Sequence, residues 1–176
     1  TTIDESAIMS LIIWMTGRPC SGKTTIARQL EKSISNLAVL DGDELYKWLG
    51  TYEFSREARI AQNKRVAHLA KLLMKHNVPV CVSMISPYNE TRINARNIID
   101  SNNFYQIYVK CDFQECEKRD VKGMYKQAKE GKIKNFTGIS DIFEEPINPN
   151  LIVNTQVDTI DDSIKKIMLF LKEQKK

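Results

Sequence analysis

Short apolar runs alternate along the chain with longer stretches in which apolar residues recur at helical spacing. The apolar runs predict strands buried on both faces, at residues 11–16, 37–40, 78–84, 105–109 and 151–154. The helical spacing predicts helices at residues 24–35, 55–76, 90–99, 113–119 and 160–172. Strands that alternate with helices indicate an α/β fold, a parallel sheet flanked by helices, with ligands bound beyond the carboxyl ends of the strands.

This pattern is interrupted between residues 120 and 149. Residues that break helices and strands are spread through the segment: Gly123, Gly131, Gly138, Pro146 and Pro149. Connections of this length in a compact domain are usually functional loops. We therefore expect a mobile lid near 120–149.

The size and composition are those of one globular domain. The chain has 176 residues, of which 42% are apolar and 27% charged, which is enough for a substantial core. We expect a single domain over 11–176, preceded by an N-terminal arm or an added segment at 1–10. The net charge of +4 suits a small anionic ligand and is too small to indicate nucleic-acid binding.

The cysteines and the lengths of the apolar runs bear on the compartment. Cys20, Cys81, Cys111 and Cys116 form no CxxC pair, which favours buried thiols in a reducing compartment. No apolar run approaches the length needed to cross a bilayer. These features predict a cytoplasmic protein that does not bind membranes.

The strongest chemical signal is Gly-Arg-Pro-Cys-Ser-Gly-Lys-Thr at residues 17–24. It matches the P-loop pattern G-x-x-x-x-G-K-[ST] and lies between a predicted strand and a predicted helix, as the motif requires. Backbone amides would hold the phosphates of ATP, Lys23 would reach the β- and γ-phosphates, and Thr24 would bind Mg²⁺. The predicted ATP-binding residues here are Gly17, Cys20, Ser21, Gly22, Lys23, Thr24 and Thr25.

A P-loop leaves the class of nucleotide-binding protein open. GTP-binding switches read guanine with Asn-Lys-x-Asp, and the nearest string, at residues 63–66, lacks the aspartate. Val39, Leu40 and Asp41 could form the metal-binding strand of a mechanical ATPase. The short chain favours a small-molecule kinase instead.

Two aspartates, Asp41 and Asp43, follow the second predicted strand and can face the P-loop across the end of the sheet. Phosphoryl transfer needs a group that positions the attacking hydroxyl and accepts its proton. The alternative is an Asp-Gly turn in which Asp43 caps a helix that begins at Glu44. Beside a P-loop, the catalytic interpretation is favoured.

From Ile12 to Leu171 the chain resembles the adenylylsulfate (APS) kinase family. The resemblance rests on several motifs besides the P-loop: Leu40-Asp41-Gly42-Asp43, Phe54-Ser55, Arg59, Ile85-Ser86-Pro87-Tyr88, Cys116-Glu117-Lys118-Arg119-Asp120, Lys122-Gly123-Met124-Tyr125-Lys126, Phe136-Thr137-Gly138-Ile139 and Asn148-Pro149. It implies a kinase, commonly dimeric, that moves the γ-phosphate of ATP to the ribose 3′-hydroxyl of adenosine 5′-phosphosulfate. ATP and Mg²⁺ are the implied cofactors.

The resemblance also assigns roles to single residues. Asp43 matches the catalytic carboxylate and Asp41 lies beside it, while Arg119 matches the residue that packs on the adenine of ATP. The remaining assignments concern the acceptor nucleotide and the lid. Phe54 and Phe136 match the aromatics around the acceptor base, Arg59, Ile85 and Ser86 match its pocket, and Lys122 and Lys126 match the lid.

The chain departs from the family on the acceptor side. Tyr46 and Asn89 stand where the family has arginines, Ala58 stands where it has aspartate, and Gln62 stands where it has asparagine. A charged hydrogen bond contributes roughly 1.5–3 kcal/mol, so losing two arginines would weaken phosphosulfate binding by on the order of a hundredfold if nothing replaced them. Tyr46, Gln62 and Asn89 are kept as acceptor-binding positions.

Two interpretations of this departure remain open. In the first, Lys47, Arg56 or Arg92 compensates and the acceptor is still adenosine 5′-phosphosulfate. In the second, the acceptor is another nucleotide with a modified 5′-phosphate, as in the related cytidine diphosphoramidate kinase of bacterial capsule biosynthesis. A non-catalytic nucleotide-binding regulator and a scaffold subunit are the alternatives outside the enzyme class.

Overall fold

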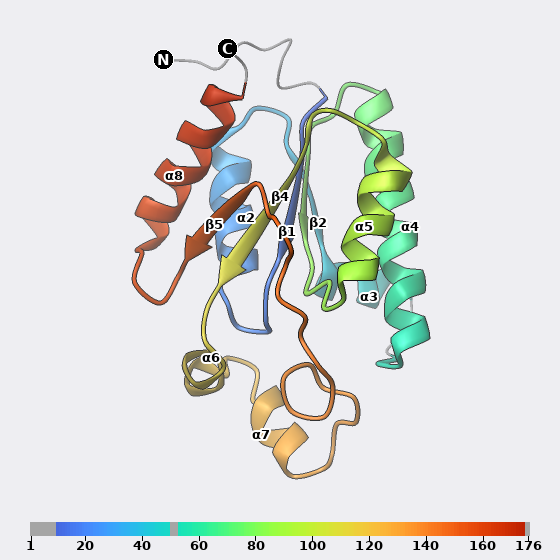
Figure 1. Ribbon diagram of the computed structural model, residues 1–176, viewed down its shortest axis with the longest axis vertical. Helices are drawn as coiled ribbons and strands as arrows, with labels where there is room; N and C mark the ends of the chain where they lie inside the picture. Colours follow the sequence, from blue (N-terminus) through green and yellow to red (C-terminus); the bar gives the residue numbers. More distant parts are fainter. Residues whose placement is uncertain (1–9, 50–52, 175–176) are drawn as a thin grey trace.

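The computed structural model describes residues 10–49 and 53–174. Five parallel strands form one sheet in the order β2-β3-β1-β4-β5 (Figure 1). The strands are β1 (Ile12–Thr16), β2 (Ala38–Asp41), β3 (Val80–Ser83), β4 (Phe104–Lys110) and β5 (Leu151–Asn154). The α/β sheet expected from the sequence is confirmed, and every strand begins and ends within two residues of its expected limits.

Helices cover both faces of the sheet. α2 (Lys23–Ser33) and α8 (Ile160–Glu173) lie on one face, and α3 (Gly42–Leu49), α4 (Arg56–Lys75) and α5 (Asn89–Ile99) lie on the other (Figure 1). The expected N-terminal arm lies outside the described residues except for Ser10. Among the described helices, none combines the length and apolar character needed to cross a bilayer.

The alternation of side chains along β1 builds the two halves of the core. Ile13 and Met15 pack toward α2 and α8, whereas Ile12 and Trp14 pack toward α4 and α5. Successive residues of a strand point to opposite faces of a sheet. A strand in the middle of a covered sheet is therefore apolar along its length, as residues 11–15 are, and the buried Thr16 that ends β1 bonds the Ile85 carbonyl.

The helix limits follow from local capping. The Ser55 side chain accepts a hydrogen bond from the backbone N of Ala58 and starts α4. Thr159 and Asp162 form a reciprocal capping box at the start of α8. Such caps satisfy backbone donors that the helix itself leaves unpaired.

The segment at 120–149 lies beyond the carboxyl ends of the strands, together with α6 (Phe113–Arg119) (Figure 1). It contains the short helix α7 (Met124–Lys129), which the apolar pattern did not predict. Its inner residues Tyr125, Ala128 and Phe136 form a separate small core with Cys111, which follows β4, and Cys116 of α6. The segment is thus a packed subdomain over the predicted site.

Candidate active site

The P-loop connects β1 to α2 and requires glycine at two positions, Gly17 and Gly22. A Cβ atom at Gly17 would lie 2.5 Å from the carbonyl oxygen of Val109. Gly22 caps α2 with φ at 97°, in the left-handed region that favours glycine. The first amides of α2 are left without helical partners, and the helix dipole is positive at this end, which makes the loop an anion site.

The ammonium group of Lys23 is folded back onto its own loop. Its Nζ donates hydrogen bonds to the carbonyl oxygens of Gly17 (2.9 Å) and Arg18 (2.8 Å), and it lies 3.4 Å from the hydroxyl of Ser21. Burial lowers the pKa of Lys23 to about 8, because desolvation disfavours the charged form. A bound triphosphate would replace these carbonyls as the partner of the ammonium group.

Thr24 of α2, predicted to bind the metal, meets Asp41 at the end of β2, beside the predicted catalytic residue Asp43. Thr24 Oγ1 donates a hydrogen bond of 2.7 Å to Asp41 Oδ2, and the backbone N of Asp43 donates one of 3.0 Å to Asp41 Oδ1. Asp41 is therefore the residue that caps the first turn of α3. The alternative in which Asp43 caps a helix from Glu44 is wrong, and the Asp43 carboxylate is exposed.

A hydroxyl beside a carboxylate suits Mg²⁺, which is usually bound by one or two protein oxygens together with water and substrate phosphates. Within the described ranges, no three His, Cys, Asp or Glu side chains gather in a way that could hold a metal alone. Thr24 and Asp41 fit an ion that arrives with its nucleotide. Thr25, next in the first turn of α2, is exposed.

On the acceptor side, Arg59 joins two parts of the predicted pocket. Its Nε donates to the backbone oxygen of Phe54 (3.1 Å), and its terminal nitrogens contact the hydroxyl of Thr137 and the backbone oxygen of Asn135. Phe136 lies between those two residues. The ring of Phe136 is covered in this structure and packs edge-on against Tyr125, with ring centroids 4.9 Å apart.

Ser86 and Gln62 are both buried but differ in pairing. The Ser86 hydroxyl donates to Asn63 (2.7 Å) and accepts from the indole of Trp14 (3.1 Å), so its hydrogen and one lone pair are used inside the protein. The Nε2 of Gln62 is buried without a hydrogen-bond partner among the described residues. A buried amide without a partner is costly, and a ligand would satisfy it. The backbone oxygen of Ile85 accepts a hydrogen bond of 2.6 Å from the Thr16 hydroxyl.

The two positions that lack the family's arginines are occupied in different ways. Tyr46 is half-buried and lines a small pocket with Glu53, Ala58, Ala61 and Arg65. The Asn89 side chain accepts a hydrogen bond of 2.7 Å from Arg92, and its backbone N donates one of 2.7 Å to Glu144.

Two of the three cations proposed as replacements are committed elsewhere, while Lys47 is exposed in the last turn of α3. Arg92 is buried and donates to the backbone oxygens of Ser86 and Glu144 as well as to Asn89. Arg56 lies over the ring of Tyr88, 4.1 Å from its centroid. Arg92 therefore connects the turn after β3 to the lid segment. Both terminal nitrogens of its guanidinium group are bonded within the protein.

No motif or apolar pattern predicted the residues that dock the lid segment. Asp141 contacts the hydroxyl of Tyr88, and Phe143 lies between the guanidinium of Arg18 and the ring of Tyr108. These contacts join residues far apart in the chain. Arg18, Asp141 and Phe143 also line a hollow beside the P-loop, together with Gly138, Ile139, Ser140 and Ile142.

Arg119, predicted to pack on adenine, is held from two sides. Its Nε donates to Glu115 (3.0 Å), and its terminal nitrogens donate to the hydroxyl (3.3 Å) and backbone oxygen (2.8 Å) of Thr155. The P-loop residue Cys20 is half-buried and packs against the small core that contains Cys116. Thr155 belongs to no motif and was not predicted.

Comparisons with known proteins agree with this geometry. A family model described as adenylylsulphate kinase matches residues 9–154. The adenylyl-sulfate kinase of Staphylococcus epidermidis is 40% identical over 169 residues, which cover 93% of this chain and 85% of that protein. The adenylyl-sulfate kinase of Rippkaea orientalis is 43% identical over 169 residues, covering 92% of this chain and 91% of that protein.

Solved structures agree as well. The APS kinase of Mycobacterium tuberculosis in complex with AMPPNP and APS is 34% identical, with a TM-score of 0.84 over 92% of this chain and 97% of that one. A gluconokinase from Sinorhizobium meliloti is 12% identical with a TM-score of 0.63, over 94% of this chain and 93% of that one, and shares the fold alone. The chain belongs to the adenylylsulphate kinase family.

Proposed function

We propose that this protein transfers the γ-phosphate of ATP to the ribose 3′-hydroxyl of adenosine 5′-phosphosulfate. One observation carries the proposal: Asp41 binds both the Thr24 hydroxyl and the Asp43 backbone N (2.7 and 3.0 Å). This places the exposed Asp43 carboxylate next to the phosphate cradle. The relative from Mycobacterium tuberculosis, solved with AMPPNP and APS, supports the same pair of ligands.

The chain's own residues provide the steps of an in-line transfer. Lys23 moves from the carbonyls of the loop to the β- and γ-phosphates, and Asp43 accepts the proton of the attacking 3′-hydroxyl. The acceptor oxygen bonds to the γ-phosphorus while the bond to the β–γ bridging oxygen breaks, and ADP leaves. Thr24 and Asp41 would hold Mg²⁺, which neutralises phosphate charge.

The remaining predicted residues bind the two nucleotides in this proposal. Arg119 packs on the adenine of ATP, and the lid lysines Lys122 and Lys126 close over the phosphates and exclude water. The acceptor is held by Phe54, Arg59, Gln62, Ile85, Ser86 and Phe136, with Tyr46 and Asn89 beside its 5′-group. For the acceptor base to enter, the Phe136 ring must leave its packed position on Tyr125.

A second acceptor is favoured by one observation. Arg92 is bonded to Ser86, Asn89 and Glu144, so it does not replace the arginines missing at Tyr46 and Asn89. Neutral hydrogen-bonding groups can accept from the amide hydrogens of a phosphoramidate, which a phosphosulfate lacks. The second candidate is therefore cytidine diphosphoramidate or a similar nucleotide.

A panel assay with Mg²⁺ and ATP separates these proposals. ADP formation is measured with adenosine 5′-phosphosulfate, cytidine diphosphoramidate and unmodified nucleotides as acceptors. We expect the highest kcat/KM with adenosine 5′-phosphosulfate. A preference for cytidine diphosphoramidate would instead select the second acceptor, and ATP binding without transfer to any nucleotide would indicate a regulator.

Assembly and compartment are further parts of the proposal. The family resemblance supports a homodimer, which light scattering of the purified protein would test. An ATP-dependent enzyme with four free cysteines, three of them buried, fits the reducing cytoplasm.

A further inference from the structure

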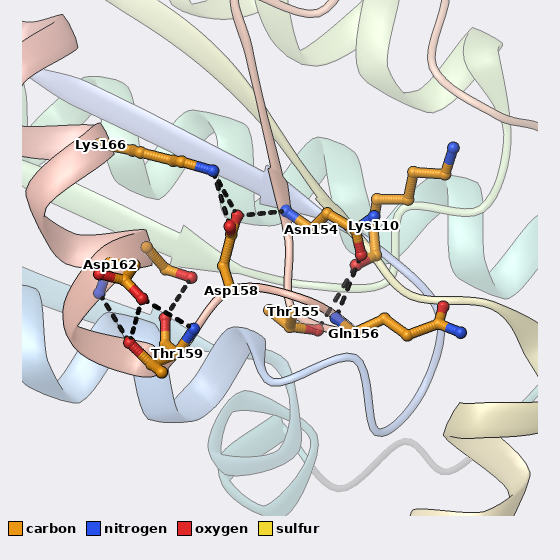
Figure 2. A network of polar contacts seen from close by, with 9 residues as sticks. Lys110, Asn154, Thr155, Gln156, Asp158, Thr159, Asp162 and Lys166 are labelled. Carbon is orange, nitrogen blue, oxygen red and sulfur yellow. Dashed lines mark hydrogen bonds and ion pairs between the residues drawn. The ribbon is translucent and has the colours of Figure 1, made fainter.

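Thr155, the first residue after β5, connects the end of the sheet to the P-loop. Its hydroxyl donates a hydrogen bond of 2.7 Å to the backbone oxygen of Ser21. Its backbone N donates one of 3.0 Å to the backbone oxygen of Lys110 at the end of β4, beside which Figure 2 shows it. Its methyl group also covers the loop, since a Cβ at Gly22 would lie 3.6 Å from Thr155 Cγ2.

The same residue holds the arginine on the adenine side. The Thr155 hydroxyl accepts from Arg119 at 3.3 Å and the Thr155 carbonyl accepts at 2.8 Å. The Thr155 hydroxyl thus donates its hydrogen to Ser21 of the P-loop and accepts a hydrogen bond from the guanidinium group of Arg119. Thr155 contacts both ends of the predicted ATP site at once.

The turn that carries Thr155 is fixed by its own hydrogen bonds (Figure 2). Asp158 accepts from the backbone N of Asn154 (3.2 Å) and from the ammonium of Lys166 (2.7 Å). The backbone N of Gln156 donates to the Asn154 side chain (3.1 Å). The capping box of α8 follows directly at Thr159. Thr155 is therefore presented by a rigid frame.

We infer that Thr155 is a positioning residue for ATP, which fixes the phosphate cradle and Arg119 relative to each other before the nucleotide arrives. The inference rests on the ATP site of the proposed function. A ligand that spans two subsites gains affinity when both are already in place, because less ordering remains for the binding step. Removing the shared hydroxyl lets the two subsites move independently.

The test compares Thr155→Val, which keeps the shape and removes the hydroxyl, with Thr155→Ser, which keeps the hydroxyl. Binding of ATP to the purified protein is measured by calorimetry without an acceptor. We expect Thr155→Val to raise the Kd for ATP about 5- to 30-fold, the effect of losing one or two hydrogen bonds, and Thr155→Ser to stay within about threefold. In turnover, Thr155→Val should raise the KM for ATP and leave kcat within about threefold.

Thr159→Val is the matched control, because it removes a threonine hydroxyl from the same turn, and the contacts of this hydroxyl among the described residues are with Asp162 at the start of α8. It should lower the melting temperature without changing the Kd for ATP. In combination with Arg119→Ala, Thr155→Val should have a smaller effect than it has alone, because it acts partly through Arg119.

Two results would overturn the inference. The first is a Kd for ATP that Thr155→Val leaves unchanged. The second is a Kd that changes equally in Thr155→Val and Thr159→Val, in step with their melting temperatures. If the wild-type protein does not bind ATP at all, the proposed function itself fails, and the calorimetry of the wild type distinguishes that case.

Discussion

Lys122 of the lid segment forms an ion pair with the carboxylate of Asp43, although the two residues are 79 positions apart in the chain. The side chains are 54% and 60% exposed, and an exposed pair of this kind contributes at most about 1 kcal/mol to stability. The pair can therefore open at little cost. In the proposed reaction, Lys122 would turn to the phosphates of a bound nucleotide and leave the Asp43 carboxylate available to the acceptor hydroxyl.

Asp43→Asn should remove the base and leave the ATP site intact. We expect kcat to fall by about 10²- to 10⁴-fold, the usual contribution of a positioned general base. The Kd for ATP should change little, because the backbone N that binds Asp41 remains. Steady-state kinetics and ATP titration measure the two effects. A variant with wild-type kcat would exclude Asp43 as the base.

The affinity for ATP should depend on pH through Lys23. Burial lowers the pKa of Lys23 to about 8 from 10.5, and the negative phosphates of ATP raise it again. Below pH 8 the free protein already carries the proton, so affinity is constant there. Above pH 8 binding must take up a proton, and we expect the affinity to fall by up to about tenfold per pH unit.

Lys23→Arg is the control for this pH dependence, because a guanidinium stays charged over the whole range. Its ATP affinity is expected to be weaker than that of the wild type but flat between pH 7 and pH 10. A wild-type affinity that is equally flat would contradict the role given to the Lys23 proton.

Thr24→Val should remove the effect of Mg²⁺ on ATP binding. The substitution keeps the shape of the side chain and removes the hydroxyl that bonds Asp41 at 2.7 Å. ATP is titrated with Mg²⁺ and again with a chelator. We expect Mg²⁺ to strengthen binding to the wild type on the order of tenfold, about 1.4 kcal/mol. The gain should be lost in Thr24→Val and kept in Thr24→Ser.

Arg92→Ala should destabilise the protein strongly. The side chain is buried and donates to the backbone oxygens of Ser86 and Glu144, which would be left without those donors. We expect a loss of about 2–4 kcal/mol in the free energy of unfolding, measured by urea denaturation.

Arg96→Ala, one turn further along α5, is the control for Arg92→Ala. Arg96 is exposed, bonds Asn150 at 3.0 Å and lies over the ring of Phe104. Its loss should cost at most about 1 kcal/mol. Equal losses of unfolding free energy in the two variants would mean that Arg92 does not stabilise the contact between the turn after β3 and the lid segment.

The sequence by itself determined the sheet, the P-loop and the family. Local signals of this kind act over a few residues, so they can be read without the fold. The short helix α7 was missed because its apolar residues face a small separate core.

Only the tertiary structure decided which predicted groups are bound to one another. Asp41 caps α3 in place of Asp43, Arg92 is committed to backbone oxygens, and the Phe136 ring is covered by Tyr125. Thr155 contacts Ser21 and Arg119 although no motif marks it. These contacts join residues that are distant in the chain, and their partners are set by how parallel strands bring loop ends to one edge of the sheet.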